Sequence, residues 1–174
     1  MDTTQSNISA AAKRHNKKRI LLAVGCVILL IIAGCLIWAL MPHMKLGGPN
    51  PYEIKEIPEL QFDISESSFP RWPVKFDYVI ENHSDGQIQC NGYGELQYQK
   101  DGVWYTVEMK DMTDGWEEHL EEWDHAYSGE SILGEYDSSD FYRRLPNGNY
   151  RFVKPVWWVG PGGHYWLSAE FVID

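Results

Sequence analysis

The residues best suited to metal chemistry lie in an acidic stretch near the middle of the chain. His119, Glu122 and His125 are spaced three apart, and imidazole and carboxylate groups are ligands that zinc uses in proteins. On a helix, positions i and i+3 are neighbours but position i+6 lies far around the cylinder, so the three side chains would not converge on one ion. The spacing therefore predicts no metal site, and we expect no cofactor.

Carboxylates are concentrated in the same stretch. Eight of them lie between Glu108 and Asp124. A calcium-binding loop needs alternating oxygen ligands and a glycine at its sixth position. Counting from Asp111, the sixth residue is Trp116, so this template fails. A solvated acidic face is the favoured interpretation, and loose cation binding stays open.

Groups for nucleophilic catalysis are missing from the sequence pattern. There is no G-x-S-x-G elbow, no phosphate-binding loop and no dinucleotide fingerprint. Cys90 has only His83 nearby in the sequence as a conceivable base. We therefore predict that the protein is not an enzyme. The alternative is a cell-envelope enzyme or metal-binding protein that uses His119, Glu122 and His125.

Tryptophan residues are the better candidates for binding. Trp157 and Trp158 are adjacent, so a strand would point them to opposite faces and one of them outward. Trp104 and Trp166 fall on the face opposite their aromatic and apolar neighbours. Exposed aromatic side chains suit sugar stacking or protein contact, and these four are the predicted binding residues. In the other interpretation, the tryptophans of the acidic stretch pack over them as a second small core.

A long apolar run divides the chain. Residues 20–40 carry no charge, and five basic residues precede them within residues 1–19 against one acid, a net charge of +4. Because the whole chain has a net charge of −10, residues 41–174 carry −14. The run is long enough, at about 1.5 Å per helical residue, to cross a bilayer core of roughly 30 Å. We predict a transmembrane helix at 20–40, and the lipid bilayer is its partner.

The charge asymmetry predicts the orientation of this helix. Basic flanks stay in the cytoplasm, so residues 1–19 form a cytoplasmic tail and the C-terminal part lies outside the cytoplasm. The alternative is a bacterial lipoprotein, because the residues that end at Cys35 resemble a lipobox. The acidic exterior part is a poor partner for nucleic acid, whose phosphates recruit Lys and Arg.

Alternating apolar and polar residues dominate the chain after residue 61. Apolar residues occupy every second position from Val74 to Ile80, and a turn sequence begins at Asn82. Asp101-Gly102 predicts a tight hairpin between two further alternating segments. Several short strands separated by Gly, Asn and Asp turns predict an all-β antiparallel sandwich over 61–174.

Two segments do not follow the alternation. Residues 41–60 contain several Gly and Pro residues without sustained periodicity, which predicts a linker that lifts the domain off the membrane. In the acidic insertion at 110–127, Trp116, Leu120, Trp123 and Tyr127 are spaced as one face of a helix. We expect a short helix or helical turn there.

The pieces in their order resemble the bacterial immunoglobulin-like domains of exported and membrane-anchored proteins. The matching segments are VKFDYVIENHSDGQI, LQYQKDGVWYTV, the Ser128–Ser131 turn, LPNGNYRFVK and YWLSAEFVID. The segment LPNGNYRFV resembles the tyrosine corner of such sandwiches, in which a phenol bonds back to the preceding turn. Tyr150 would supply this phenol and Gly148 the positive φ of the turn, as structural residues.

The resemblance implies an immunoglobulin-like sandwich used for adhesion, spacing or recognition, with no catalytic residues. We therefore expect a single-pass protein of a bacterial cell surface that binds a protein or glycan ligand outside the cell, or serves as a structural module. A second alternative is an accessory subunit whose membrane helix pairs with a partner protein.

Overall fold

The computed structural model describes residues 24–38, 44–110, 122–159 and 163–174. The chain divides into two compact units, Met1–Met41 and Pro42–Asp174. In the first unit, residues 24–38 form a helix whose large apolar side chains are exposed, with Leu30 73% accessible. Within the described residues, no helix is both long and apolar enough to span a bilayer. Residues 1–23 and 39–43 lie outside the described part, so the predicted 20–40 span stays a prediction.

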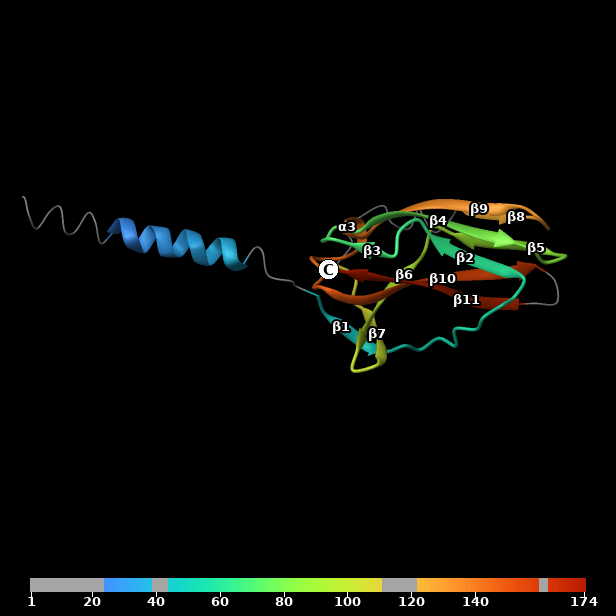
Figure 1. The fold of residues 1–174 in the computed structure, drawn as a ribbon, viewed down its shortest axis with the longest axis horizontal. Helices are drawn as coiled ribbons and strands as arrows, with labels where there is room; N and C mark the ends of the chain where they lie inside the picture. The colour runs from blue at the N-terminus through green and yellow to red at the C-terminus, as the bar shows by residue number, and fades with distance from the viewer. Residues whose placement is uncertain (1–23, 39–43, 111–121, 160–162) are drawn as a thin grey trace, which may run out of the picture. The chain divides into compact units, whose positions relative to one another are not determined.

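The second unit is built from two β-sheets (Figure 1). The smaller sheet has the order β2-β4-β9, formed by Leu60–Ile64, Lys75–Asn82 and Ser131–Asp137. The larger sheet has the order β1-β7-β6-β10-β11-β3, and β5 and β8 extend it through β10. Its strands are Leu46–Pro49 (β1), Ser68–Phe69 (β3), Gln87–Asn91 (β5), Glu95–Lys100 (β6), Val103–Val107 (β7), Trp123–Ala126 (β8), Gly148–Val159 (β10) and Gly163–Ile173 (β11). A short helix, α3 (Ser138–Phe141), follows β9. The predicted all-β sandwich is confirmed, and its pairs are antiparallel except for β11 and β3, which are parallel.

The core lies between the two sheets and is mostly aromatic. Alternation along β4 buries Phe76, Tyr78 and Ile80 on one face, as the sequence predicts. The rings of Phe76 and Tyr78 meet the ring of Phe152 from β10, at centroid distances of 5.3 and 5.7 Å. Phe171 of β11 packs against Phe76 at 5.7 Å. Aromatic pairs at these distances add to the area that they bury, so this cluster ties the two layers together.

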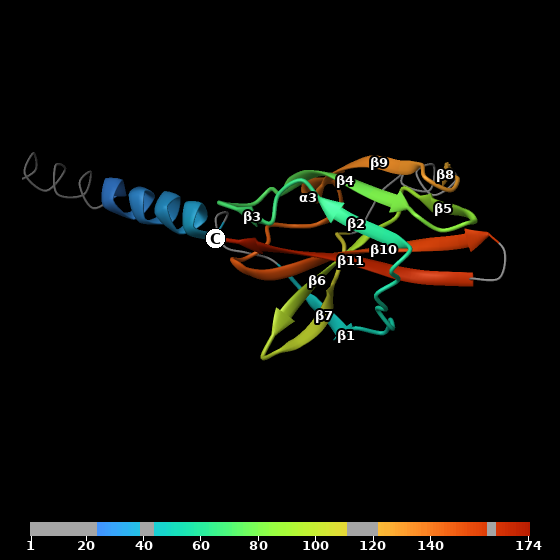
Figure 2. The same ribbon diagram turned by 45° about the vertical axis from the view of Figure 1, so that its right-hand side comes forward.

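Turn chemistry fixes the register of the strands. Asp101 and Gly102 both have positive φ, 51° and 77°, and close the predicted hairpin between β6 and β7. The long pair β10–β11 stays in register from Gly148↔Ile173 to Trp158↔Gly163. Figures 1 and 2 show this pair running along the domain, while β1, β7 and β6 bend away from it.

The linker prediction for 41–60 is wrong at residues 46–49, which belong to the larger sheet. Residues 46–49 form β1, which pairs antiparallel with β7, and Asn50 N donates to Trp104 O at 2.8 Å. Met44, Leu46 and Ile57 pack against the core. We call residues 44–57 the N-terminal strap. The Gly and Pro content predicts an irregular linker, but the open edge of β7 supplies the hydrogen bonds that make part of the strap a strand.

The helix predicted within 110–127 is wrong for its described C-terminal part. Trp123–Ala126 is strand β8, paired antiparallel with β5 from Asn91↔Trp123 to Ile88↔Ala126. Trp123 and Tyr127 have helical spacing, but a strand is favoured here because its backbone bonds to the edge of β5 and because it buries Ala126. Trp116 and Leu120 lie outside the described residues, as does the rest of 111–121.

Candidate binding surface

Five aromatic rings form a continuous row on the outer face of the larger sheet. Trp123 of β8 meets Trp157 of β10 at a centroid distance of 4.9 Å and an interplanar angle of 73°. Trp157 stacks on His164 at 4.3 Å and 22°, and His164 meets Trp166 at 5.0 Å and 60°. Tyr52 of the strap stacks on Trp166 at 3.7 Å. We call these five residues the aromatic row.

Exposure along the aromatic row decreases from β8 toward the strap. Trp123 is 39% and Trp157 37% accessible, while Trp166 and Tyr52 are half-buried. Large apolar side chains with this accessibility, side by side on one sheet face, mark contact surfaces. The end of the row at Trp123 and Trp157 is therefore the part that is open to a ligand.

The four predicted binding tryptophans lie in three different environments. Trp157 and Trp166 belong to the aromatic row. Trp158 points to the opposite face of β10, is half-buried and packs against the core. Trp104 lies at the other end of the outer face, where the guanidinium of Arg151 sits 4.6 Å from its ring centroid. The structure thus brings Trp157 and Trp166 together and places Trp158 and Trp104 apart from them.

A buried polar network holds the strap against the outer face. Tyr52 Oη donates to Glu95 Oε2 at 3.1 Å, and Gln97 Nε2 donates to Asn50 Oδ1 at 2.9 Å and to Glu95 Oε1 at 3.0 Å. Burial, together with the carboxylate of Glu95, raises the pKa of Tyr52 to about 12. Arg151 Nε donates to Gln97 Oε1 at 2.8 Å. Gln97 therefore links a buried cation to a buried anion, so neither charge is isolated.

Tyr150 and Gly148 occupy the start of β10. Tyr150 Oη donates to the carbonyl of Pro146 at 2.8 Å, which is the contact of a tyrosine corner. Gly148 has φ of 148°, and a Cβ at this position would lie 2.6 Å from Tyr98 Cε2. The chain crosses here from the smaller sheet to the larger one, between β9 and β10.

Potentially reactive groups in the core are already engaged or buried. Lys154 Nζ donates to the carbonyls of Asn91 and Tyr93, at 2.7 and 3.0 Å, and lies 4.8 Å from the ring centroid of Tyr78. Burial lowers the pKa of this amine from its usual value. Burial also raises the pKa of the Cys90 thiol to about 11. Cys90 is fully inaccessible, so it lacks both the thiolate and the access that a nucleophile needs.

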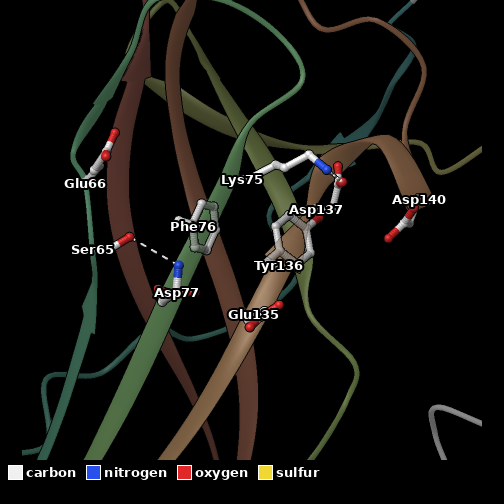
Figure 3. Close-up of a pocket in the computed structure, with 9 residues that line it drawn as sticks. All are labelled: Ser65, Glu66, Lys75, Phe76, Asp77, Glu135, Tyr136, Asp137 and Asp140. Atoms are coloured by element: carbon white, nitrogen blue, oxygen red, sulfur yellow. Dashed lines mark hydrogen bonds and ion pairs between the residues drawn. The ribbon is translucent and has the colours of Figure 1, made fainter.

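A hollow of about 600 Å³ lies at one end of the sandwich, beside β4 and β9 (Figure 3). It is rich in carboxylates, but Figure 3 shows Glu66 and Asp140 on opposite sides of it. Lys75 pairs with Asp137, and although burial opposes the shift, hydrogen bonds from Lys75 and Ser139 lower the pKa of that carboxyl. Across the described ranges, no group of three or more His, Cys, Asp or Glu side chains is arranged to hold a metal ion.

The alternative metal ligands are only partly described. Glu122 directly precedes β8, His125 lies within it, and His119 lies outside the described residues. His125 Nδ1 is 3.2 Å from Gln87 Nε2 of the neighbouring strand. The sequence does not predict Tyr52 and His164 as members of the aromatic row, and it brings Trp123 there only in the interpretation in which the tryptophans of the acidic stretch pack over the binding residues. Alternation in β11 puts His164 on the face of Trp166, a signal that was available; the other two depend on long-range pairing.

Comparisons with known proteins place this fold in a family. Residues 56–172 match the bacterial Ig-like domain family. A search of curated proteins finds no match. Among solved structures, a β-glucosidase from Erythrobacter marinus is similar at 10% identity and a TM-score of 0.31, over 76% of this chain and 16% of that one. The family match spans most of the chain and nearly all of the sandwich, and the chain belongs to the bacterial Ig-like domain family.

Proposed function

We propose that the protein is a non-catalytic binding module anchored in a bacterial membrane, with its Ig-like domain outside the cytoplasm. The uncharged run at 20–40 and the basic residues before it support the anchor. The described helix at 24–38 adds support, because its large side chains are apolar and exposed, and such a surface is favourable in lipid rather than in water.

The observation that carries the binding role is the open end of the aromatic row. Trp123 and Trp157 meet on the outer face of the larger sheet, and each is more than one third accessible. In a domain that buries most of its large side chains, two neighbouring exposed indoles are costly unless they contact a ligand. The rigid sandwich holds them in place, and recognition resides in these side chains.

Two observations support a non-catalytic role. The family consists of modules that are generally not enzymes. Of the nucleophilic groups that the sequence offers, Cys90 is buried with a pKa raised by burial to about 11. The module therefore acts by contact.

The anchor is tested with a reporter that works only outside the cytoplasm. Alkaline phosphatase fused after Asp174 of the full chain should be active in intact cells and fractionate with membranes. Replacing residues 20–40 with a cleavable signal peptide should release the active fusion from the membrane. An inactive fusion to the full chain overturns the orientation. Mass spectrometry of the mature N-terminus distinguishes an intact helix from a lipoprotein that begins at Cys35.

Binding is tested with the full chain in lipid nanodiscs and isolated cell-wall fragments. The wild-type nanodiscs should co-sediment with the fragments, and the double variant Trp123→Ala/Trp157→Ala should lose at least tenfold in apparent affinity. Tyr127→Ala is the matched control, because Tyr127 is 59% accessible and lies outside the aromatic row. Equal co-sedimentation of the double variant and the wild type contradicts the proposed binding surface.

A further inference from the structure

At the open end of the aromatic row, four neighbouring strands place one residue each in a line across the sheet. His125 of β8 lies opposite Gln89 of β5, Gln89 lies opposite Trp157 of β10, and Trp157 lies opposite His164 of β11. Directly opposite residues in antiparallel strands share a face. This line of four residues spans three strand intervals, about 14 Å at roughly 4.8 Å each.

Alternation places further residues of these strands on the same outer face. The inward residues Ile88, Cys90, Ala126 and Val156 are each 0% accessible. We define the aromatic–amide platform as the outward residues of this end that are at least partly accessible, which are Gln87, Gln89, Asn91, Trp123, His125, Trp157, Val159, His164 and Trp166.

The platform carries no formally charged residue. This is unusual in a protein with 40 charged residues of 174, whose exterior part has a net charge of −14. A partner with phosphate or carboxylate groups, such as nucleic acid or an anionic lipid surface, recruits Lys and Arg, and none of the described platform positions supplies them. The missing charges point to a neutral ligand.

The side chains of the platform supply both kinds of contact that a sugar needs. Indole and imidazole rings pack against the apolar C–H faces of pyranose rings. Amide groups donate and accept hydrogen bonds, which suits neutral hydroxyl groups. Gln87 Nε2 is used by His125 at 3.2 Å, whereas the amide of Gln89 has no partner among the residues that the structure describes. Gln89 lies between Trp157 and His125 and is therefore placed to bond a ligand that stacks on the indole.

The size of the platform favours a short chain of sugars over a folded protein. Its extent is about 14 Å across the strands and roughly 13 Å along them, on the order of 200 Å². A stable protein interface buries about 800 Å² on each partner. A protein partner would therefore need several times this surface, and the next outward residues with a charge along β10 and β11 are Arg151 and Glu170.

We propose that the aromatic–amide platform binds a neutral glycan, with its sugars lying across β8, β5, β10 and β11. This inference rests on the proposed binding function and names the chemical class of its ligand. Trp123 and Trp157 provide the stacking surfaces, and Gln89 with the two histidines His125 and His164 provides hydrogen bonds to the hydroxyl groups.

The test uses the full chain in lipid nanodiscs and isothermal titration calorimetry with four probes. Chitotetraose, maltotetraose and cellotetraose are neutral, and a tetramer of guluronate is the charged counterpart. At least one neutral tetrasaccharide should bind with a sub-millimolar Kd that is unchanged between 50 and 500 mM NaCl. Guluronate should bind at least tenfold more weakly, because an acidic domain repels it.

Three variants assign this binding to the platform. Trp157→Ala should weaken the Kd by at least tenfold. Gln89→Leu keeps the size of the side chain and should weaken it by at least threefold without changing the unfolding temperature, so a folding defect is excluded. Leu133→Ala is the control, because Leu133 is 74% accessible on β9 of the smaller sheet, and it should leave the Kd unchanged.

Failure of the glycan inference is distinguishable from failure of the binding function. If no neutral tetrasaccharide binds while Trp123→Ala/Trp157→Ala still reduces attachment to wall fragments, the ligand is of another class and the glycan inference is wrong. If that double variant changes neither measurement, both proposals are wrong. Binding that Gln89→Leu and Trp157→Ala leave intact also overturns the glycan inference.

Discussion

Tyr52 makes the N-terminal strap part of the folded domain, and its removal should be costly. Its hydroxyl donates to Glu95 Oε2 at 3.1 Å, and a hydrogen bond to a charged group contributes about 1.5 kcal/mol. Its ring stacks on Trp166 at 3.7 Å, which contributes about 1 kcal/mol. Burial of roughly 60 Å² of ring surface at about 25 cal/mol per Å² contributes about 1.5 kcal/mol more. Tyr52→Ala should therefore lower the free energy of unfolding by about 3 to 4 kcal/mol.

The same reasoning separates the contribution of the Tyr52 hydroxyl from that of its ring. Tyr52→Phe keeps the ring and loses only the hydroxyl, and Tyr93 still donates to Glu95 Oε2, so we expect a loss of about 1 kcal/mol. Equilibrium urea denaturation of the full chain in detergent, followed by tryptophan fluorescence, measures both values. Tyr127→Ala is the control and should change stability by less than about 0.5 kcal/mol. The reasoning is refuted if Tyr52→Ala costs no more than Tyr127→Ala.

Three further predictions concern the tyrosines and glycines of the sandwich. Tyr150→Phe leaves the carbonyl of Pro146 without its donor and should cost about 1 to 2 kcal/mol in the same denaturation assay, whereas an unchanged midpoint argues against the corner. Gly134→Ala would place a Cβ 2.3 Å from Tyr78 Cζ and should cost about 1 to 3 kcal/mol, while Gly48→Ala meets nothing within 4 Å and should be nearly neutral by thermal unfolding. Burial raises the pKa of Tyr78 and Tyr150 above 10, so these hydroxyl groups lose their protons at a lower pH in the unfolded state than in the folded state. The free energy of unfolding should therefore fall as pH rises above about 10. A urea midpoint that stays constant from pH 9 to 11.5 contradicts this prediction.

Much of the sandwich follows from local patterns in the sequence. The alternation of Phe76, Tyr78 and Ile80 predicts which face of β4 is buried, because one face of a sandwich strand always meets the other sheet. Asp101-Gly102 predicts the β6–β7 hairpin, because few other residue pairs adopt positive φ at both positions. Such features depend on neighbours in the sequence, and the structure confirms them.

The candidate site could be predicted only in part, because it depends on pairing between distant segments. Trp157 and Trp166 are recognisable from alternation within their own strands. Trp123 joins them only because β8 pairs with β5, and a local helical spacing pointed elsewhere. Tyr52 joins them because the strap returns over the outer face, which Gly and Pro composition does not reveal. Long-range register is the information that a single sequence carries least clearly.

The strap also determines how the domain responds to mechanical load. The polypeptide enters the sandwich through β1, so tension applied from the N-terminal side reaches the β1–β7 bonds and the Asn50–Trp104 bond before it reaches β6 or β10. Once these bonds break, the strap at 44–57 can span at most roughly 46 Å while the aromatic core stays closed. A domain pulled from its N-terminal side would thus lengthen before its two sheets separate.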